Sequence, residues 1–156
     1  MFTTVKMFKF EAAHYLKNHR GQCRHIHGHS YKVHVALQSE YLVTQCPSAE
    51  GMVMDFSTLK EQFQPKIDEW DHTLLVEYAS DVPGIDTGQW GTYGHKIVEL
   101  GFRPTAENMA RHLFDVVDTI LYHLRQELHP EVVRRNVSVA WVRVYETDTS
   151  YAEFSL

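Results

Sequence analysis

The sequence HGHSYKVHVALQS, residues 27–39, alternates apolar and polar side chains more regularly than the segment before it. Every second position from Tyr31 to Leu37 is apolar, and polar side chains such as His34 lie between them. Successive side chains of a β-strand point to opposite faces of the sheet. Residues 28–39 therefore predict a strand that buries one of its faces.

Three other segments also predict strands. Residues 4–12 (TVKMFKFEA) alternate loosely and contain β-branched and aromatic side chains. Residues 136–146 (NVSVAWVRVYE) give the strongest strand pattern of the chain, and residues 150–155 (SYAEFS) predict a short last strand. Because the strands occur in two groups, we expect hairpins to join them in an antiparallel sheet.

Two segments predict amphipathic helices. The first runs from a candidate N-cap, Ser57, to about residue 70, with an apolar side chain at every fourth position. Its internal Pro65 should kink this helix or limit it to its first part. The second helix covers about residues 106–128 after the N-cap Thr105, and it has a longer apolar face.

The order strand, strand, helix, helix, strand, strand predicts an α+β fold. We expect a four-stranded antiparallel sheet with two helices on one face. The glycine-rich residues 76–103 predict a long loop with little structure of its own, inside one domain that spans residues 1–156. Such a sheet exposes two edges, and sheets joined between subunits into a barrel would cover them.

The composition excludes several classes of function. The net charge is −5 and basic residues are scattered, so we expect no nucleic-acid partner. We expect no membrane partner, since the sequence contains no run of 18 apolar residues. The chain has only two cysteines and begins without a signal-peptide core, which favours a cytoplasmic location without disulfides.

Eleven histidines point instead to metal or acid–base chemistry. His27 and His29 are two residues apart, so both imidazoles would lie on one face of a strand. His14 ends the first predicted strand and comes within reach if the first two strands form a hairpin. Three histidines with an open fourth position are typical of a catalytic zinc site.

The role of Cys23 has two interpretations. As a fourth ligand it would close the site into a structural His₃Cys zinc centre. As a thiolate it would be a base or nucleophile whose pKa is lowered by Arg24, His25 and the nearby ion. The spacing of the residues does not separate these two roles.

Six motifs in order give a resemblance that extends over nearly the whole chain. They are FKFEAAH (8–14), CRHIHGH (23–29), VMDF (53–56), DHTLL (71–75), RPTAEN (103–108) and VRVYET (142–147). Together they resemble the 6-pyruvoyl-tetrahydropterin synthase-like family. The three residues between Cys23 and the HGH triplet are similar to the branch that makes 6-carboxytetrahydropterin, because the 6-pyruvoyl branch has a longer gap.

The resemblance implies a tunnelling fold, in which four strands and two helices per subunit assemble into trimers that close a barrel. Two trimers usually stack into a homohexamer, with active sites between subunits. It also implies a pterin triphosphate substrate: 7,8-dihydroneopterin triphosphate would give 6-carboxy-5,6,7,8-tetrahydropterin, acetaldehyde and triphosphate. This carbon–carbon lyase step belongs to the biosynthesis of 7-deazaguanine compounds such as queuosine.

The metal and its neighbouring thiol come first among the implied site residues. His14, His27 and His29 match the zinc ligands of the family, and zinc would hold the side-chain oxygens of the pterin. Cys23 matches the family's catalytic cysteine, which as a thiolate can remove a side-chain proton.

Four further residues complete the implied site. Asp71 and His72 match an acid–base pair in which the carboxylate orients the imidazole. Glu146 matches the pterin anchor, because a carboxylate accepts paired hydrogen bonds from a ring N–H and an amine. Glu107 is a weaker candidate, since a negative charge also stabilises a helix N-terminus.

Some alternatives remain open at this point. The long segment 76–103 departs from the family pattern and could alter the pocket mouth or a subunit contact. A cationic group formed by Lys17, Arg20, Arg24 and His25 could bind the triphosphate. The chain could also be another pterin side-chain lyase, or a non-catalytic zinc module that serves assembly.

Overall fold

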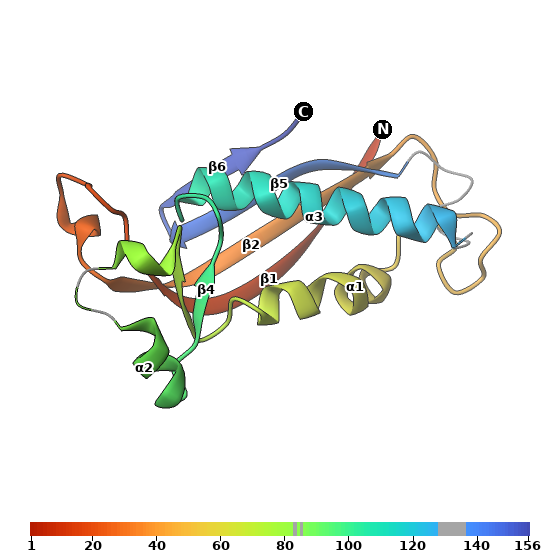
Figure 1. Ribbon diagram of the computed structural model, residues 1–156. Coiled ribbons are helices and arrows are strands. Elements are labelled where there is room, and N and C mark those ends of the chain that lie inside the picture. Colours follow the sequence, from red (N-terminus) through yellow and green to blue (C-terminus); the bar gives the residue numbers. More distant parts are fainter. Residues whose placement is uncertain (83, 85, 128–136) are drawn as a thin grey trace.

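The computed structural model describes residues 1–82, 84, 86–127 and 137–156 (Figure 1). The strands and helices, in chain order, are β1 (Phe2–His14), β2 (His27–Ser39), α1 (Phe56–Asp68), β3 (Thr73–Val76), α2 (Thr87–Thr92), β4 (Ile97–Glu99), α3 (Ala106–Gln126), β5 (Ser138–Thr147) and β6 (Ser150–Phe154). Two short 3₁₀ turns, η1 (Gln22–Arg24) and η2 (Ala79–Asp81), lie in the connections.

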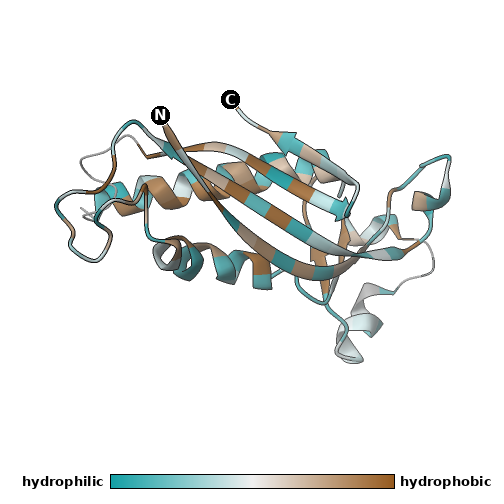
Figure 2. Ribbon diagram, turned by 180° about the vertical axis from the view of Figure 1, so that it is seen from behind, coloured by the Kyte–Doolittle hydropathy of each residue, from teal (hydrophilic) through white to brown (hydrophobic). Residues whose placement is uncertain are grey.

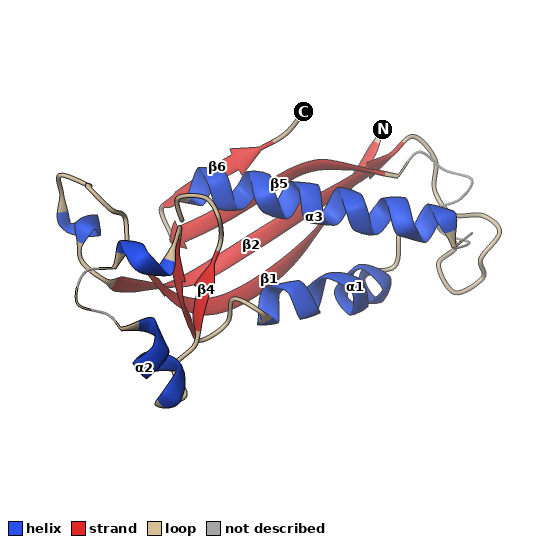
Figure 3. Cartoon of the chain, viewed as in Figure 1, coloured by secondary structure: helices blue, strands red, loops and turns tan. Residues whose placement is uncertain are grey.

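One mixed sheet forms the centre of the molecule, with strand order β4-β3-β1-β2-β5-β6. The four strands β1, β2, β5 and β6 pair antiparallel, which confirms the expected α+β arrangement. Helices α1 and α3 both cover the same face of this sheet (Figures 1 and 3). The sheet is larger than expected, because β3 and β4 extend it beyond β1 in parallel orientation.

The alternation read from the sequence decides which side chains enter the core. The hairpin register places Phe8 opposite Val33 and Phe10 opposite Tyr31. All four side chains are buried beneath the helices. Hydrophilic and hydrophobic residues alternate along the strands, as the view from the side opposite to Figure 1 shows (Figure 2). Burial of one face thus fixes the register of the hairpin.

The helix boundaries differ in part from the expected ones. The N-cap of α1 is Asp55 rather than Ser57, because the Asp55 carboxylate accepts a hydrogen bond from the Ser57 amide at 2.7 Å. Pro65 does not end this helix, which continues to Asp68. Thr105 caps α3 as expected, through its hydroxyl and the Asn108 amide. The expected end of α3 at residue 128 and the start of the next strand at residue 136 lie outside the described residues.

The segment after β3 has more structure than the expected loop. It contains η2, α2 and β4, and it packs a small cluster around Val76 and Val82 that Trp90 and Ile97 complete. Both β3 and β4 were missed for a physical reason: β3 is buried at all four positions and therefore shows no alternation, and β4 has only three residues. No helix among the described residues is both long and apolar enough to cross a membrane.

Candidate functional site

The candidate site lies where the core face of the β1–β2 hairpin becomes polar. The register that pairs Phe10 with Tyr31 continues to His14, which lies opposite His27 at the end of the hairpin. His29 lies between Tyr31 and His27 on the same face of β2, since the three residues alternate along the strand. The hydrophobic face of the sheet therefore ends in three imidazoles.

These imidazoles are close enough to share one ion. One ring nitrogen from each of His14, His27 and His29 lies within 4.8 Å of the others. The Nε2 atoms of His14 and His27 are 2.9 Å apart. The His14 side chain is only 1% exposed, whereas the other two rings are half-buried. These three residues could hold a metal ion.

Backbone carbonyls next to the rings of His14 and His27 determine which ring nitrogen carries the proton. The Nδ1 of His14 lies 2.8 Å from the Pro104 carbonyl oxygen, and the Nδ1 of His27 lies 2.7 Å from that of His25. A carbonyl only accepts hydrogen bonds, so both Nδ1 atoms must carry the proton. In neutral rings the two Nε2 lone pairs then face each other without a proton between them. A cation bound by both lone pairs removes this repulsion, and such carbonyl contacts are typical of metal-bound histidines.

Burial favours the neutral form of the His14 and His29 rings. It lowers the pKa of His14 from 6.5 to about 4, although the hydrogen bond to Pro104 opposes this shift. Burial also lowers the pKa of His29, while the charge of Glu146 and a hydrogen bond to the Glu146 backbone act in the opposite direction. Metal ligands must be deprotonated to bind, so these shifts favour binding near neutral pH.

A cavity of about 290 Å³ lies beside the imidazoles and is lined by Cys23, Glu107 and Glu146. Glu146, near the end of β5, connects this cavity to the cluster of three imidazoles through its backbone contact with His29. Glu107 enters from the first turn of α3. Three residues proposed from separate motifs therefore line one cavity.

Cys23 lies in η1, within the connection between β1 and β2. Its carbonyl accepts a hydrogen bond from the Leu16 amide at 3.1 Å, which holds the turn against the end of β1. Among the residues that the structure describes, the group able to hold a metal consists of the three histidines and does not include this thiol. The geometry therefore favours a thiol beside the metal site over a closed His₃Cys centre.

Asp71 and His72 form a pair that is fixed against the edge strand β1. Asp71 Oδ2 lies 2.9 Å from His72 Nδ1, and Asp71 Oδ1 accepts the Glu11 amide at 2.8 Å. This amide, followed by His72, lowers the pKa of the Asp71 carboxyl. The His72 backbone is left-handed, with φ of 56°, a strained conformation that clusters at functional sites. The pair leaves the His72 Nε2 available for proton exchange.

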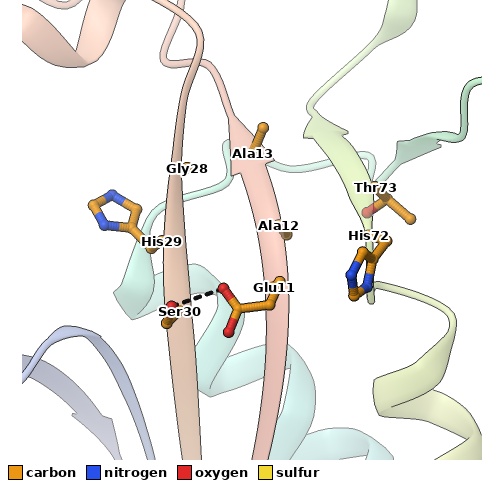
Figure 4. Close-up of a pocket in the computed structure, with 8 residues that line it drawn as sticks. All are labelled: Glu11, Ala12, Ala13, Gly28, His29, Ser30, His72 and Thr73. Carbon is orange, nitrogen blue, oxygen red and sulfur yellow. Dashed lines mark hydrogen bonds between the residues drawn. The ribbon is translucent and has the colours of Figure 1, made fainter.

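The Asp71–His72 pair does not share the cavity of Cys23. His72 lines a different cavity of about 440 Å³, together with Glu11, Gly28 and Ser30. His29 also borders this cavity, but its ring points away from β1 and from His72 (Figure 4). Within one chain the structure therefore separates Cys23 from His72.

One of the cations proposed for the triphosphate is engaged outside that group, because Lys17 forms an ion pair of 2.6 Å with Asp81. Arg24 donates a hydrogen bond at 3.3 Å to His25, which belongs to the same group. The cavity that contains Cys23 is instead lined by His19, which the sequence interpretation left without a role. His19 lies in the same β1–β2 connection as Cys23, and this closeness in sequence could have indicated that it borders the same cavity.

Tyr31 was assigned only to the core, although its ring also borders the site. Its centroid is 5.4 Å from that of His29 and 6.0 Å from that of His14. Its position two residues after His29 could have indicated this proximity, because both side chains lie on one face of β2.

Comparisons with known proteins place these features in a wider group. A family described as "6-pyruvoyl tetrahydropterin synthase" matches residues 3–156. A Haemophilus influenzae protein named 6-carboxy-5,6,7,8-tetrahydropterin synthase is 30% identical over 99% of both chains. An Aquifex aeolicus protein of the same name is 31% identical, with 96% of this chain and 94% of that protein covered.

Solved structures support the fold. An uncharacterized protein from Wolinella succinogenes superposes with a TM-score of 0.71 at 24% identity, covering 99% of this chain and 97% of that one. The 6-pyruvoyl tetrahydropterin synthase of Caenorhabditis elegans gives a TM-score of 0.63 at 23% identity, with coverage of 99% and 95%.

The buried imidazole of His14 predicts a pH-dependent stability for the metal-free protein. Its pKa is 6.5 when unfolded and about 4 when folded, so the unfolded state binds more protons between these values. The free energy of unfolding should therefore fall by about 2 kcal/mol from pH 7 to pH 5 on account of this group. Urea unfolding of the wild type and of His14→Gln at both pH values would measure the difference. An equal fall in both proteins would contradict the prediction, and His123→Gln on α3 is the control.

Proposed function

The chain belongs to the 6-pyruvoyl tetrahydropterin synthase family, and we propose that it is a zinc-dependent lyase acting on a pterin side chain. The proposed reaction converts 7,8-dihydroneopterin triphosphate and one water molecule into 6-carboxy-5,6,7,8-tetrahydropterin, acetaldehyde and triphosphate. The names of the full-length relatives and the short spacing between Cys23 and the HGH triplet support this product. A cytoplasmic place in the biosynthesis of 7-deazaguanine compounds such as queuosine belongs to the same proposal.

The facing lone pairs of His14 and His27 carry the proposal, because they define a cation site next to a cavity with acid–base groups. With His29 they would form a three-nitrogen ligand set, which fits zinc and leaves a coordination position open. When bound, zinc supplies Lewis acidity that stabilises negative charge on substrate oxygens.

The other residues bind the pterin and move protons. Glu146 would accept hydrogen bonds from the N–H and amino groups of the pterin edge, and Glu107 at the same cavity would be a second, weaker anchor. The Cys23 thiolate would remove a proton from the side chain of the substrate. His72, oriented by the ionised Asp71, would exchange protons with the substrate and with Cys23.

The proposed roles of Cys23 and His72 in one reaction require a neighbouring subunit. Because Cys23 and His72 line different cavities of one chain, we propose that each complete site takes its acid–base pair from an adjacent copy. Among the described residues, β6 is an edge strand, and Phe2–Glu11 of β1 pairs only with β2. Val5 and Met7 are exposed on this strand, as expected for a surface that a neighbour covers. A homohexamer built as a dimer of trimers, each subunit one domain of residues 1–156, would join these edges.

Turnover of the substrate tests the reaction. The purified, zinc-loaded protein should release acetaldehyde from 7,8-dihydroneopterin triphosphate, and the mass of the pterin product should correspond to the 6-carboxy compound. Cys23→Ala should lower kcat by about 10² to 10⁴-fold, since it removes the proposed base. Cys46→Ala is the matched control and should retain activity.

Other outcomes would replace this proposal with one of the alternatives. A 6-pyruvoyl product would identify a related pterin lyase. Zinc bound without any pterin turnover would favour a module for assembly. Full activity of Cys23→Ala would refute the proposed role of the thiol.

Metal affinity tests the imidazole cluster independently of turnover. His27→Ala should lower zinc affinity by at least about 10-fold, because it removes one of three nitrogen ligands. His34→Ala, on the opposite face of the same strand, should bind zinc like the wild type. Competition with a chromophoric chelator would measure both affinities, and equal values would contradict the assigned ligands.

Mixed oligomers test the shared site. Cys23→Ala and His72→Ala subunits should each be nearly inactive alone. If the two groups come from adjacent copies, unfolding and refolding them together should restore up to about a quarter of the sites. If both groups served a site within one chain, the mixture would stay as inactive as its components. Equal mixing of wild type and double mutant provides the reference for refolding yield.

A further inference from the structure

The Tyr31 hydroxyl is a buried polar group without a protein partner. The side chain is 0% exposed. Within the described part of the chain, its oxygen is the one buried side-chain oxygen or nitrogen that makes no hydrogen bond. Buried hydroxyls nearly always have a partner, because the loss of water is otherwise uncompensated. A phenylalanine would fill the same core position without this cost.

Packing on both sides holds the phenol ring in place. Tyr31 stacks on Phe10 with centroids 4.8 Å apart and an interplanar angle of 10°. The imidazoles of His29 and His14 contact it edge-on, at angles of 71° and 87°. The phenol ring is therefore held between aromatic neighbours that are themselves buried or half-buried.

The surroundings of the hydroxyl are those of the candidate active site. The β2–β5 register pairs Lys32 with Tyr145, so the next pair in this antiparallel ladder brings Tyr31 beside Glu146. The carboxylate of Glu146 and the thiol of Cys23 both interact electrostatically with the phenol. These two residues line the cavity that we assign to the pterin.

We propose that the Tyr31 hydroxyl donates a hydrogen bond to an acceptor atom of the pterin that binds between Glu146 and the three imidazoles. The inference rests on the proposed function, since it names a further substrate contact at the same site. A phenol is protonated at neutral pH, so it can supply the proton of this bond.

The chemistry of the two groups is complementary. Glu146 only accepts hydrogen bonds and can pair only with the N–H and amino groups of a pterin. The same ring also carries a carbonyl oxygen and ring nitrogens, which require donors. Tyr31 supplies a donor close to the Glu146 carboxylate, so the two residues together would select a ring that presents donors and acceptors side by side.

Tyr31→Phe tests this contact because it removes one oxygen and leaves the ring. In the zinc-loaded protein without ligand, the melting temperature should equal or exceed that of the wild type, since an unpaired buried hydroxyl is lost. Binding of neopterin, an unreactive aromatic pterin, should weaken about 3- to 10-fold in a fluorescence titration. Tyr122→Phe, on the exposed side of α3, is the matched control and should change neither quantity.

Three results would overturn the inference. A lower melting temperature of ligand-free Tyr31→Phe would show that the hydroxyl has a structural partner. Unchanged neopterin affinity would show that it does not contact the pterin, and a loss of zinc affinity would assign it to the metal site. If the wild type binds neopterin, loses affinity on Tyr31→Phe and yet releases no acetaldehyde, the proposed reaction fails while the contact stands. If the wild type turns over and Tyr31→Phe changes nothing, only the contact fails.

Discussion

The antiparallel register between β1 and β2 is the constraint on which the site depends. It places His14 opposite His27 and, in the same alternation, Phe10 opposite Tyr31. A shift by one residue would turn every side chain of one strand to the other face, so the core and the imidazole cluster would be lost together. The hydrophobic part of the hairpin thus holds the polar part in place, and the rings of Phe10 and Tyr31 are where the two parts meet.

The site contains groups that do not favour the folded state by themselves. His14 is buried and neutral, with a lone pair directed at that of His27, and the Tyr31 hydroxyl has no partner within the described residues. His72 adopts a left-handed backbone that the amide and carbonyl of Glu11 hold in place. Such local costs persist when the surrounding fold is stable enough to maintain them, and here they gather around the two candidate cavities.

Much of the fold followed from periodicity, and the exceptions have identifiable causes. Strands β1, β2, β5 and β6 and the helix after Thr105 were predicted. In the longer of these elements, the buried face repeats its pattern many times. β3 and β4 were not predicted, since one is buried throughout and the other has three residues. The start of α1 was misplaced by two residues because Asp55 and Ser57 are both good N-caps, and only the backbone shows which carboxylate or hydroxyl accepts the amide.

The sequence by itself predicted a pair of histidines on one strand face and a third at the end of the preceding strand, because neighbouring residues share a local geometry. The Asp71–His72 pair was predicted only by the resemblance to the family, since an Asp-His dipeptide has no distinctive spacing. Only the tertiary structure decided that the Nδ1 atoms of His14 and His27 point at carbonyls. It also decided that Cys23 lies outside the group of candidate metal ligands. Glu107 and Glu146 line the same cavity as Cys23, which the sequence does not show. The tertiary structure also decided that His72 lies in another cavity. These relations join segments up to about 120 residues apart, and only the packing of helices on the sheet brings such segments to a defined distance.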